Sequence, residues 1–161
     1  MQKELDPVDI QILQLLQENA RMTNKEIGEK LHKTATPIND RVRRLQDMGV
    51  IKRYVAVLDH DKIHRGLMAF THVQLKDHSK DILGNFERQI IQSPEVLECY
   101  HLSGAADFLL KVAVRDLKAY HEFLMNRLFN IMAVGSVESK FVFKEAKSEN
   151  AFPLEALIGP A

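Results

Sequence analysis

Three short segments in the first fifty residues place apolar side chains at helical spacing. Asp6-Pro7 opens the first segment, because Asp caps a helix and Pro suits its first position, and Asn19-Ala20 ends it. Thr23 and Glu26 have the spacing of a capping box and open the second segment. The apolar positions on the inner faces of these two helices are Val8, Ile12, Leu13, Leu16, Ile27 and Leu31.

The third segment predicts a helix with one apolar face and one polar face. It begins at Thr34 or at Thr36, since either hydroxyl can cap it, and it ends at Gly49. Its inner face consists of Ile38, Val42 and Leu45. Residues 50–58 follow as an extended stretch rich in β-branched and aromatic side chains.

The rest of the chain mixes alternating patterns with helical ones. Strands are expected over residues 69–76, 96–102, 108–115 and 137–143, and helices over 80–92 and 117–128, the latter with Leu117, Tyr120, Leu124 and Leu128 inward. This order, strand–helix–strand twice, is the split βαβ arrangement. We therefore predict an α+β fold, in which an N-terminal helix-turn-helix domain (1–53) and a linking strand and hinge (54–66) precede a ferredoxin-like βαββαβ domain (67–161).

The distribution of charge supports two different tasks in one chain. The 161 residues include 22 basic and 22 acidic side chains, and a net charge of zero alone argues against a nucleic-acid binder. Residues 21–53, however, carry nine basic and four acidic side chains, a local net charge of +5. Residues 54–161 carry a net charge of −2. The basic segment coincides with the predicted helix-turn-helix, which favours contact with DNA there.

The second and third predicted helices have the features that DNA reading requires. The third can lock its apolar face on the other two while its opposite face offers Arg, Asn and Thr, the side chains that bind base edges and phosphates. The alternative is a solvated, charged helix in a three-helix bundle. Pattern alone leaves both interpretations open.

The chain resembles the leucine-responsive/asparagine-regulator (Lrp/AsnC) family of transcription regulators over roughly residues 5–155. The segments that carry the resemblance are Leu5-Asp6-x-x-Asp9 with Ile12-Leu13, Leu16-Gln17-Glu18-Asn19-Ala20-Arg21, Thr36-Pro37-x-x-x-Arg41-Val42-Arg43-Arg44-Leu45, Gly49-Val50-Ile51 with Tyr54, Gly104-x-x-Asp107 with Leu109-Leu110-Lys111-Val112, and Phe152-Pro153-Leu154. The resemblance implies double-stranded DNA as a partner, a small-molecule effector that is often an amino acid, and homodimers that assemble to tetramers or octamers.

The resemblance also implies a set of DNA-facing residues on the third helix. They are Thr34, Thr36, Pro37, Asn39, Arg41, Arg43 and Arg44. Thr34-Ala35 departs from the Ser-Pro common in the family, and Ile38-Asn39-Asp40 also varies, so the preferred DNA sequence does not transfer. A dimer would place two such helices about 34 Å apart and read a two-fold operator, with the strand 54–58 as a dimer-forming element.

The effector site implied by the resemblance lies at the Gly-x-x-Asp turn of the C-terminal domain. Its candidate residues are Tyr100, His101, Leu102, Ser103, Gly104, Asp107, Val137, Glu138 and Ser139. A glycine turn lets backbone N–H groups approach a carboxylate, and an acidic side chain can hold an ammonium group. Ala105 and Ala106 stand where many members carry an acid and an aromatic. The alternative is a plain β-turn in which Asp107 bonds its own backbone.

Other features point away from catalysis. Cys99 is the only cysteine, and His60 with His64 lies in a polar linker that favours surface histidines over metal ligands. The sequence contains no phosphate loop, nucleophile elbow or zinc-protease helix, so we expect no enzyme, no cofactor and no metal. Without an apolar run of membrane length or a signal segment, we expect a cytoplasmic protein. Two alternatives remain: an architectural nucleoid-type DNA-binding protein, and a small-molecule sensor or enzyme of ferredoxin-like fold.

Overall fold

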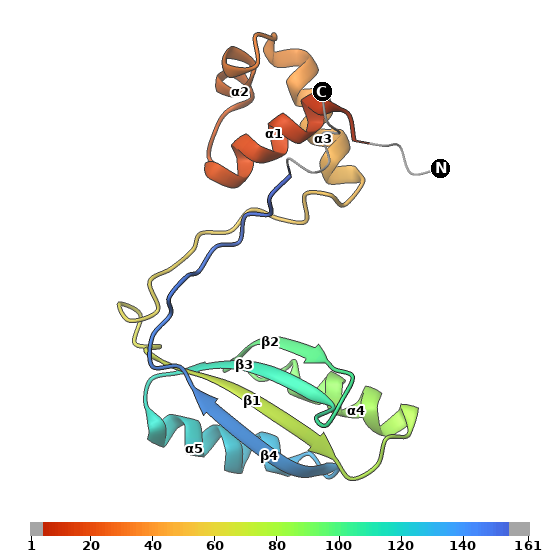
Figure 1. Cartoon of the computed structure of the whole chain (residues 1–161), viewed down its shortest axis with the longest axis vertical. Helices are drawn as coiled ribbons and strands as arrows, with labels where there is room; N and C mark the ends of the chain where they lie inside the picture. Colours follow the sequence, from red (N-terminus) through yellow and green to blue (C-terminus); the bar gives the residue numbers. More distant parts are fainter. Residues whose placement is uncertain (1–4, 155–161) are drawn as a thin grey trace. The chain divides into compact units, whose positions relative to one another are not determined.

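The computed structural model describes residues 5–154, which form two compact units (Figure 1). The first unit contains the described residues up to Val57 together with those from Lys147 onward. The second unit is Leu58–Ala146. The predicted domain bounds at residues 53 and 66 stay predictions. The predicted C-terminal domain includes residues 147–154, which here belong to the first unit, and its end at residue 161 lies outside the described residues.

The first unit is built on three helices, α1 (Pro7–Glu18), α2 (Asn24–Lys30) and α3 (Ala35–Asp47). The Asp6 carboxylate accepts hydrogen bonds from the backbone of Val8 and Asp9, and Thr23 forms the predicted capping box with Glu26. The cap of α3 is Thr34, so the helix includes Thr36, and the Thr34 hydroxyl makes no capping hydrogen bond. Gly49 follows α3 with φ +70°, a left-handed conformation that ends the helix.

A C-terminal strap, residues 147–154, packs against the helices of the first unit. The Phe152 backbone N–H donates to Gln17 Oε1 at 2.7 Å, and Gln17 Nε2 donates to the Phe152 carbonyl at 3.1 Å. Leu154 packs against the apolar core of the three helices. No local sequence pattern indicates this contact, because a side-chain amide can pair with any extended backbone segment.

Replacing Gln17 with Ala should destabilise the first unit by about 1 kcal/mol, because it removes both hydrogen bonds to the strap. Urea denaturation of the full chain measures this loss. Gln11, an exposed residue of the same helix, provides the matched control Gln11→Ala. Equal stabilities for the two variants would contradict a stabilising role for the strap.

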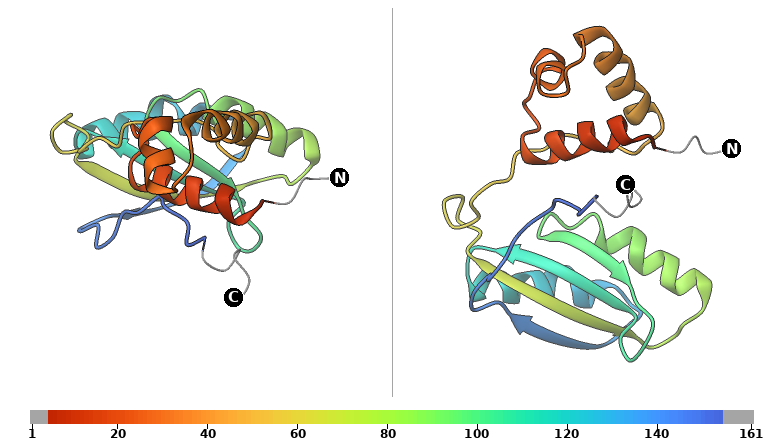
Figure 2. Two further views of the ribbon diagram at one scale, coloured as in Figure 1. Left: turned by 90° about the horizontal axis from the view of Figure 1, so that it is seen from above. Right: turned by 45° about the horizontal axis from the view of Figure 1, so that its top comes forward.

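The second unit is a four-stranded antiparallel sheet with both helices on one face (Figure 2). Its elements are β1 (Leu67–Leu75), α4 (Lys80–Ile90), β2 (Val96–His101), β3 (Phe108–Val114), α5 (Leu117–Asn126), the 3₁₀ turn η1 (Leu128–Asn130) and β4 (Val134–Phe141). The strand order β2-β3-β1-β4 places the first strand beside both the third and the fourth. This arrangement is the ferredoxin-like topology that the sequence predicts.

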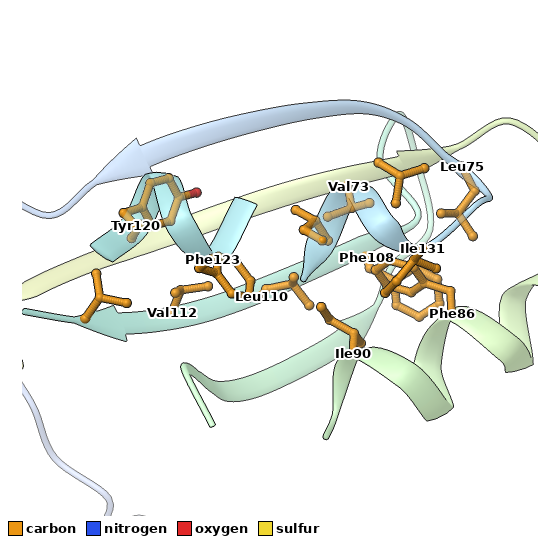
Figure 3. Close-up of a cluster of buried hydrophobic side chains, with 14 residues drawn as sticks. Val73, Leu75, Phe86, Ile90, Phe108, Leu110, Val112, Tyr120, Phe123 and Ile131 are labelled. Atoms are coloured by element: carbon orange, nitrogen blue, oxygen red, sulfur yellow. The ribbon is translucent and has the colours of Figure 1, made fainter. Parts of the chain in front are cut away.

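The core of the second unit lies between the sheet and its two helices (Figure 3). Phe108, Leu110 and Val112 of β3 point into it with Phe86 of α4, as the alternating pattern predicts. Leu117, predicted to point inward, is 62% exposed; it is the first residue of α5, one turn before the buried residues Tyr120 and Phe123.

The stretch after α3 pairs as a strand with no other segment that the structure describes. Residues 54–58 belong to no sheet of the described chain, and Val55, Val57 and Leu58 expose most of their surface. The predicted linking strand therefore pairs with no strand among residues 5–154. Among residues 5–154 no helix is long and apolar enough to span a bilayer.

Candidate functional site

The α3 helix divides cleanly into a buried face and an exposed face. Ile38, Val42 and Leu45 are buried against α1 and α2, as predicted. On the opposite side Thr36, Asn39 and Arg43 are exposed. Their spacing of three and four residues places all three on one stripe of the helix surface. This stripe, with exposed Thr34 and Pro37 at the start of the helix, offers hydroxyl, amide and guanidinium groups to a partner.

Arg41 and Arg44 do not belong to that exposed stripe. Arg41 Nη1 bonds Asp9 Oδ1 at 2.8 Å and also bonds Asp6, while Arg44 Nη2 bonds the other oxygen of Asp9. The expectation that both guanidinium groups face DNA therefore differs from the structure, in which they join α3 to the start of α1. The position of Arg41 explains its contact, since it lies three residues after Ile38 and four before Leu45 and so borders the buried face.

Asp9 is the centre of this ion-pair cluster and is fully buried. Its carboxylate accepts hydrogen bonds from both arginines and from the Asp6 backbone N–H at 3.1 Å. Such saturation offsets the cost of removing a charge from water. Partial burial acts to raise the pKa of Asp6, but the hydrogen bonds from Arg41 and from the Asp9 backbone outweigh it, and this pKa lies below its ordinary value.

The cluster reduces the basic surface that remains for a partner. Two of the nine basic residues of segment 21–53, Arg41 and Arg44, are paired with Asp6 and Asp9. The remaining seven are all exposed: Arg21, Lys25, Lys30, Lys33, Arg43, Lys52 and Arg53. Arg43 is the one of these seven that lies within α3. It is therefore the guanidinium best placed to enter a groove with that helix.

The second unit has a cavity of about 410 Å³ on the sheet face that the helices leave open. It is lined by His72 and Gln74 of β1, Ser136 and Glu138 of β4, and Leu102, Ser103, Ala105 and Ala106 of the turn between β2 and β3. In the β1–β4 register His72 lies opposite Glu138 and Gln74 opposite Ser136. These paired positions place all four side chains on one face.

The cavity contains only part of the predicted effector set. Leu102, Ser103 and Glu138 line it, and Gly104 lies in the same turn with φ +129°. His101 stacks on Phe108 with ring centroids 4.9 Å apart, on the helix-covered face. The Tyr100 hydroxyl donates to Glu98 at 2.6 Å and is outside the cavity lining.

Val137 and Ser139 point to the other face of the sheet. Val137 packs against the core, and the Ser139 hydroxyl bonds the Tyr120 hydroxyl at 2.6 Å. Both were predicted to line the effector site beside Glu138. They do not line the cavity, because neighbouring residues of a strand face opposite sides of the sheet.

Asp107 is engaged in holding the turn rather than lining the cavity. Its Oδ2 accepts the Leu75 backbone N–H at 2.7 Å, and its Oδ1 lies 3.1 Å from His78 Nε2. Its own backbone N–H donates to the Val73 carbonyl. The Asp107 carboxylate thus has a structural contact, but with a neighbouring strand and not with its own backbone as the plain β-turn would have it. Its contact with an effector stays a prediction.

The cavity combines a carboxylate with backbone N–H groups that can donate hydrogen bonds. Among the lining residues that the structure describes, exposed Glu138, whose Oε1 lies 3.5 Å from Lys140 Nζ, supplies the one carboxylate. Gln74, Ser103 and Ser136 supply neutral polar groups. At the turn, the backbone N–H groups of residues 104–106 find no acceptor within residues 5–154. Five lining residues were not predicted from the sequence: His72, Gln74, Ser136, Ala105 and Ala106. The register of β1 with β4 is the signal that identifies the first three.

Comparisons with known proteins cover both units. A winged helix-turn-helix DNA-binding model matches residues 5–52, and an Lrp/AsnC ligand binding domain model matches residues 68–152. The chain is 36% identical over 151 residues to the Bkd operon transcriptional regulator of Pseudomonas aeruginosa, covering 94% of this chain and 99% of the relative. It is 38% identical over 154 residues to the glutamate uptake regulatory protein of Zymomonas mobilis, covering 96% and 93%.

A solved structure is similar over the same extent. A transcriptional regulator of Neisseria meningitidis, crystallised as a complex with L-methionine, aligns with a TM-score of 0.89 and 37% identity. The alignment covers 95% of this chain and 99% of that one. Both units, and the order in which they occur, are therefore shared with these proteins.

Proposed function

The chain belongs to the Lrp/AsnC family of transcriptional regulators, and on this premise we propose that α3 reads the major groove of an operator while an amino acid binds the sheet cavity. The observation that carries the DNA half is the exposed stripe of α3 opposite its buried face. A recognition helix needs such a division, because one face must be locked to the domain while the other contacts base edges.

Each residue of the exposed stripe has a role that its chemistry fits. Arg43 binds a guanine edge or a phosphate, Asn39 binds a base edge, and Thr36 holds phosphate or base. Thr34 and Pro37 position the start of the helix at the groove. Arg41 and Arg44 act as positioning residues that fix α3 on α1 through Asp9.

A single short helix contacts few base pairs, so we propose that two copies bind together. The exposed apolar stretch 54–58 has no strand partner among residues 5–154 and is available to pair with the same stretch of a second copy. Two-fold pairing places two α3 helices about one DNA turn, roughly 34 Å, apart. Further association to tetramers or octamers would extend the contact along DNA.

Footprinting on a promoter fragment at moderate salt tests this function. We expect discrete protected sites with two-fold symmetric halves centred about 10 base pairs apart. Continuous protection without preferred sites would instead support an architectural DNA-binding protein. Sedimentation of the same sample reports whether the bound species is a dimer or a larger assembly.

Two features of the cavity support the proposal that an amino acid binds there. The turn N–H groups of residues 104–106 are suited to an α-carboxylate, and Glu138 is suited to an α-ammonium group. The methionine complex of the Neisseria meningitidis relative shows that a protein of this fold binds an amino acid. Here Ala105 and Ala106 leave room for the ligand's side chain.

The variant Glu138→Gln should weaken amino-acid binding about tenfold or more, because the neutral amide cannot offset the ammonium charge. Calorimetric titration with a panel of the twenty amino acids measures this. The matched control is Glu122→Gln, which removes the same charge from an exposed position of α5, on the helix-covered side of the sheet. This variant should bind the amino acid as tightly as the unmodified chain. Equal affinities for the two variants would exclude Glu138 as the ammonium ligand.

A further inference from the structure

One side-chain hydrogen bond joins α2 to the exposed stripe of α3. Asn24 Nδ2 donates to Asn39 Oδ1 at 2.9 Å. Asn24 is the half-buried first residue of α2, and Asn39 is exposed at the fifth position of α3. A neutral hydrogen bond open to water contributes little to stability. Its main consequence is orientation, because a free Asn amide rotates broadly about its last torsion and this bond fixes which way its oxygen and nitrogen point.

The fixed amide of Asn39 keeps the groups that base reading requires. Its Oδ1 retains a second lone pair, and its Nδ2 retains both hydrogens. An acceptor beside a donor matches the major-groove edge of adenine, which presents the N6 amino donor and the N7 acceptor. Asn39 lies on the same stripe as Thr36 and Arg43, so the amide is directed to the side of α3 that faces a partner.

We propose that Asn24 and Asn39 act as one unit that reads a single adenine in each operator half-site. Asn39 binds the base, and Asn24 is a positioning residue that sets the orientation of the Asn39 amide. The proposal rests on the proposed function, because it requires α3 to lie in the major groove. Without Asn24 the Asn39 amide rotates freely, and one of its orientations turns a donor toward the donor of adenine. Preference for adenine falls, while sequence-independent affinity remains.

The experiment compares the unmodified chain with Asn24→Ala, Asn39→Ala, the double variant, and Asn85→Ala as an exposed asparagine of α4 in the other unit. An operator is first selected from a random duplex library with the unmodified chain. Each base pair is then exchanged in turn, and affinities are measured by fluorescence anisotropy. Melting temperatures confirm that every variant is folded.

We expect the unmodified chain to prefer adenine at one position of each half-site by roughly tenfold or more. Asn24→Ala, Asn39→Ala and the double variant should lose this preference at the same position and to a similar extent, because coupled residues are not additive. Asn85→Ala should retain it. Affinity for a random duplex should stay within about twofold for all variants.

Three results would overturn the proposal while leaving the proposed function intact. In the first, Asn24→Ala keeps the base preference of the unmodified chain. In the second, Asn24→Ala and Asn39→Ala lose base preference at different positions of the operator. In the third, these variants lose affinity uniformly across all duplexes. Failure of the unmodified chain to select any duplex would instead remove the proposed function, and this reading with it.

Discussion

Replacing Asp9 with Ala should destabilise the DNA-binding unit by about 2–4 kcal/mol, a large share of the stability of a small domain. The substitution removes the buried carboxylate that holds Arg41 and Arg44 of α3 on α1, and it removes the reciprocal half of the Asp6 capping box. Arg41 keeps Asp6 as a partner and both guanidinium groups reach water in part, which limits the loss. Urea denaturation followed by circular dichroism measures it.

Two comparisons separate the ion-pair cluster from the general effect of losing an acid. Asp40→Ala removes an exposed carboxylate from α3 and should change stability by less than about 0.5 kcal/mol. The second unit should unfold at the same denaturant concentration in all variants, since its core lies in residues 58–146. If Asp9→Ala were as stable as Asp40→Ala, the cluster would not hold α3 in place.

Replacing Arg43 with Ala should lower operator affinity at least tenfold, since a bidentate guanidinium–base pair contributes about 1–3 kcal/mol and a dimer loses two of them. Stability should not change, because Arg43 is exposed and no ion pair involves it within the described chain. Gel-shift titration with the selected operator gives the affinity. Arg88→Ala, an exposed arginine of α4, should bind DNA like the unmodified chain. If Arg43→Ala bound the operator as tightly as the unmodified chain, Arg43 would be excluded from the DNA interface.

The helices and strands were largely predictable from sequence, because their signals are local. The Asp6 and Thr23 caps, the inner face of α3 and the alternation along β3 each depend on residues within one element. The ion pairs of Arg41 were not predictable from composition, since an arginine on such a helix is basic whether it faces a partner or an acid of α1. The helical position of Arg41, beside Ile38 and Leu45, carried the information.

The cavity depends on pairings that a single sequence does not reveal. Glu138 lines the cavity together with the turn, but the residue opposite it, His72, comes from a strand sixty-six positions earlier and is placed by the β1–β4 register. Adjacent Val137 and Ser139 were included because nearness in sequence was taken for nearness in space. Asp107 bonds the backbone of Leu75, a long-range contact without a local pattern.

The central proposal is that Arg43 contacts DNA while Arg44 holds α3 on α1. It is tested by comparing Arg43→Ala with Arg44→Ala in one experiment that records both operator affinity and melting temperature. Arg43→Ala should lose affinity at least tenfold with an unchanged melting temperature. Arg44→Ala should melt several degrees lower, since Asp9 loses one of its two guanidinium partners, yet bind the operator within about twofold at temperatures where it is folded. The opposite pattern, with Arg44→Ala stable but unable to bind and Arg43→Ala binding normally, would contradict the assignment of the exposed stripe as the DNA-reading surface.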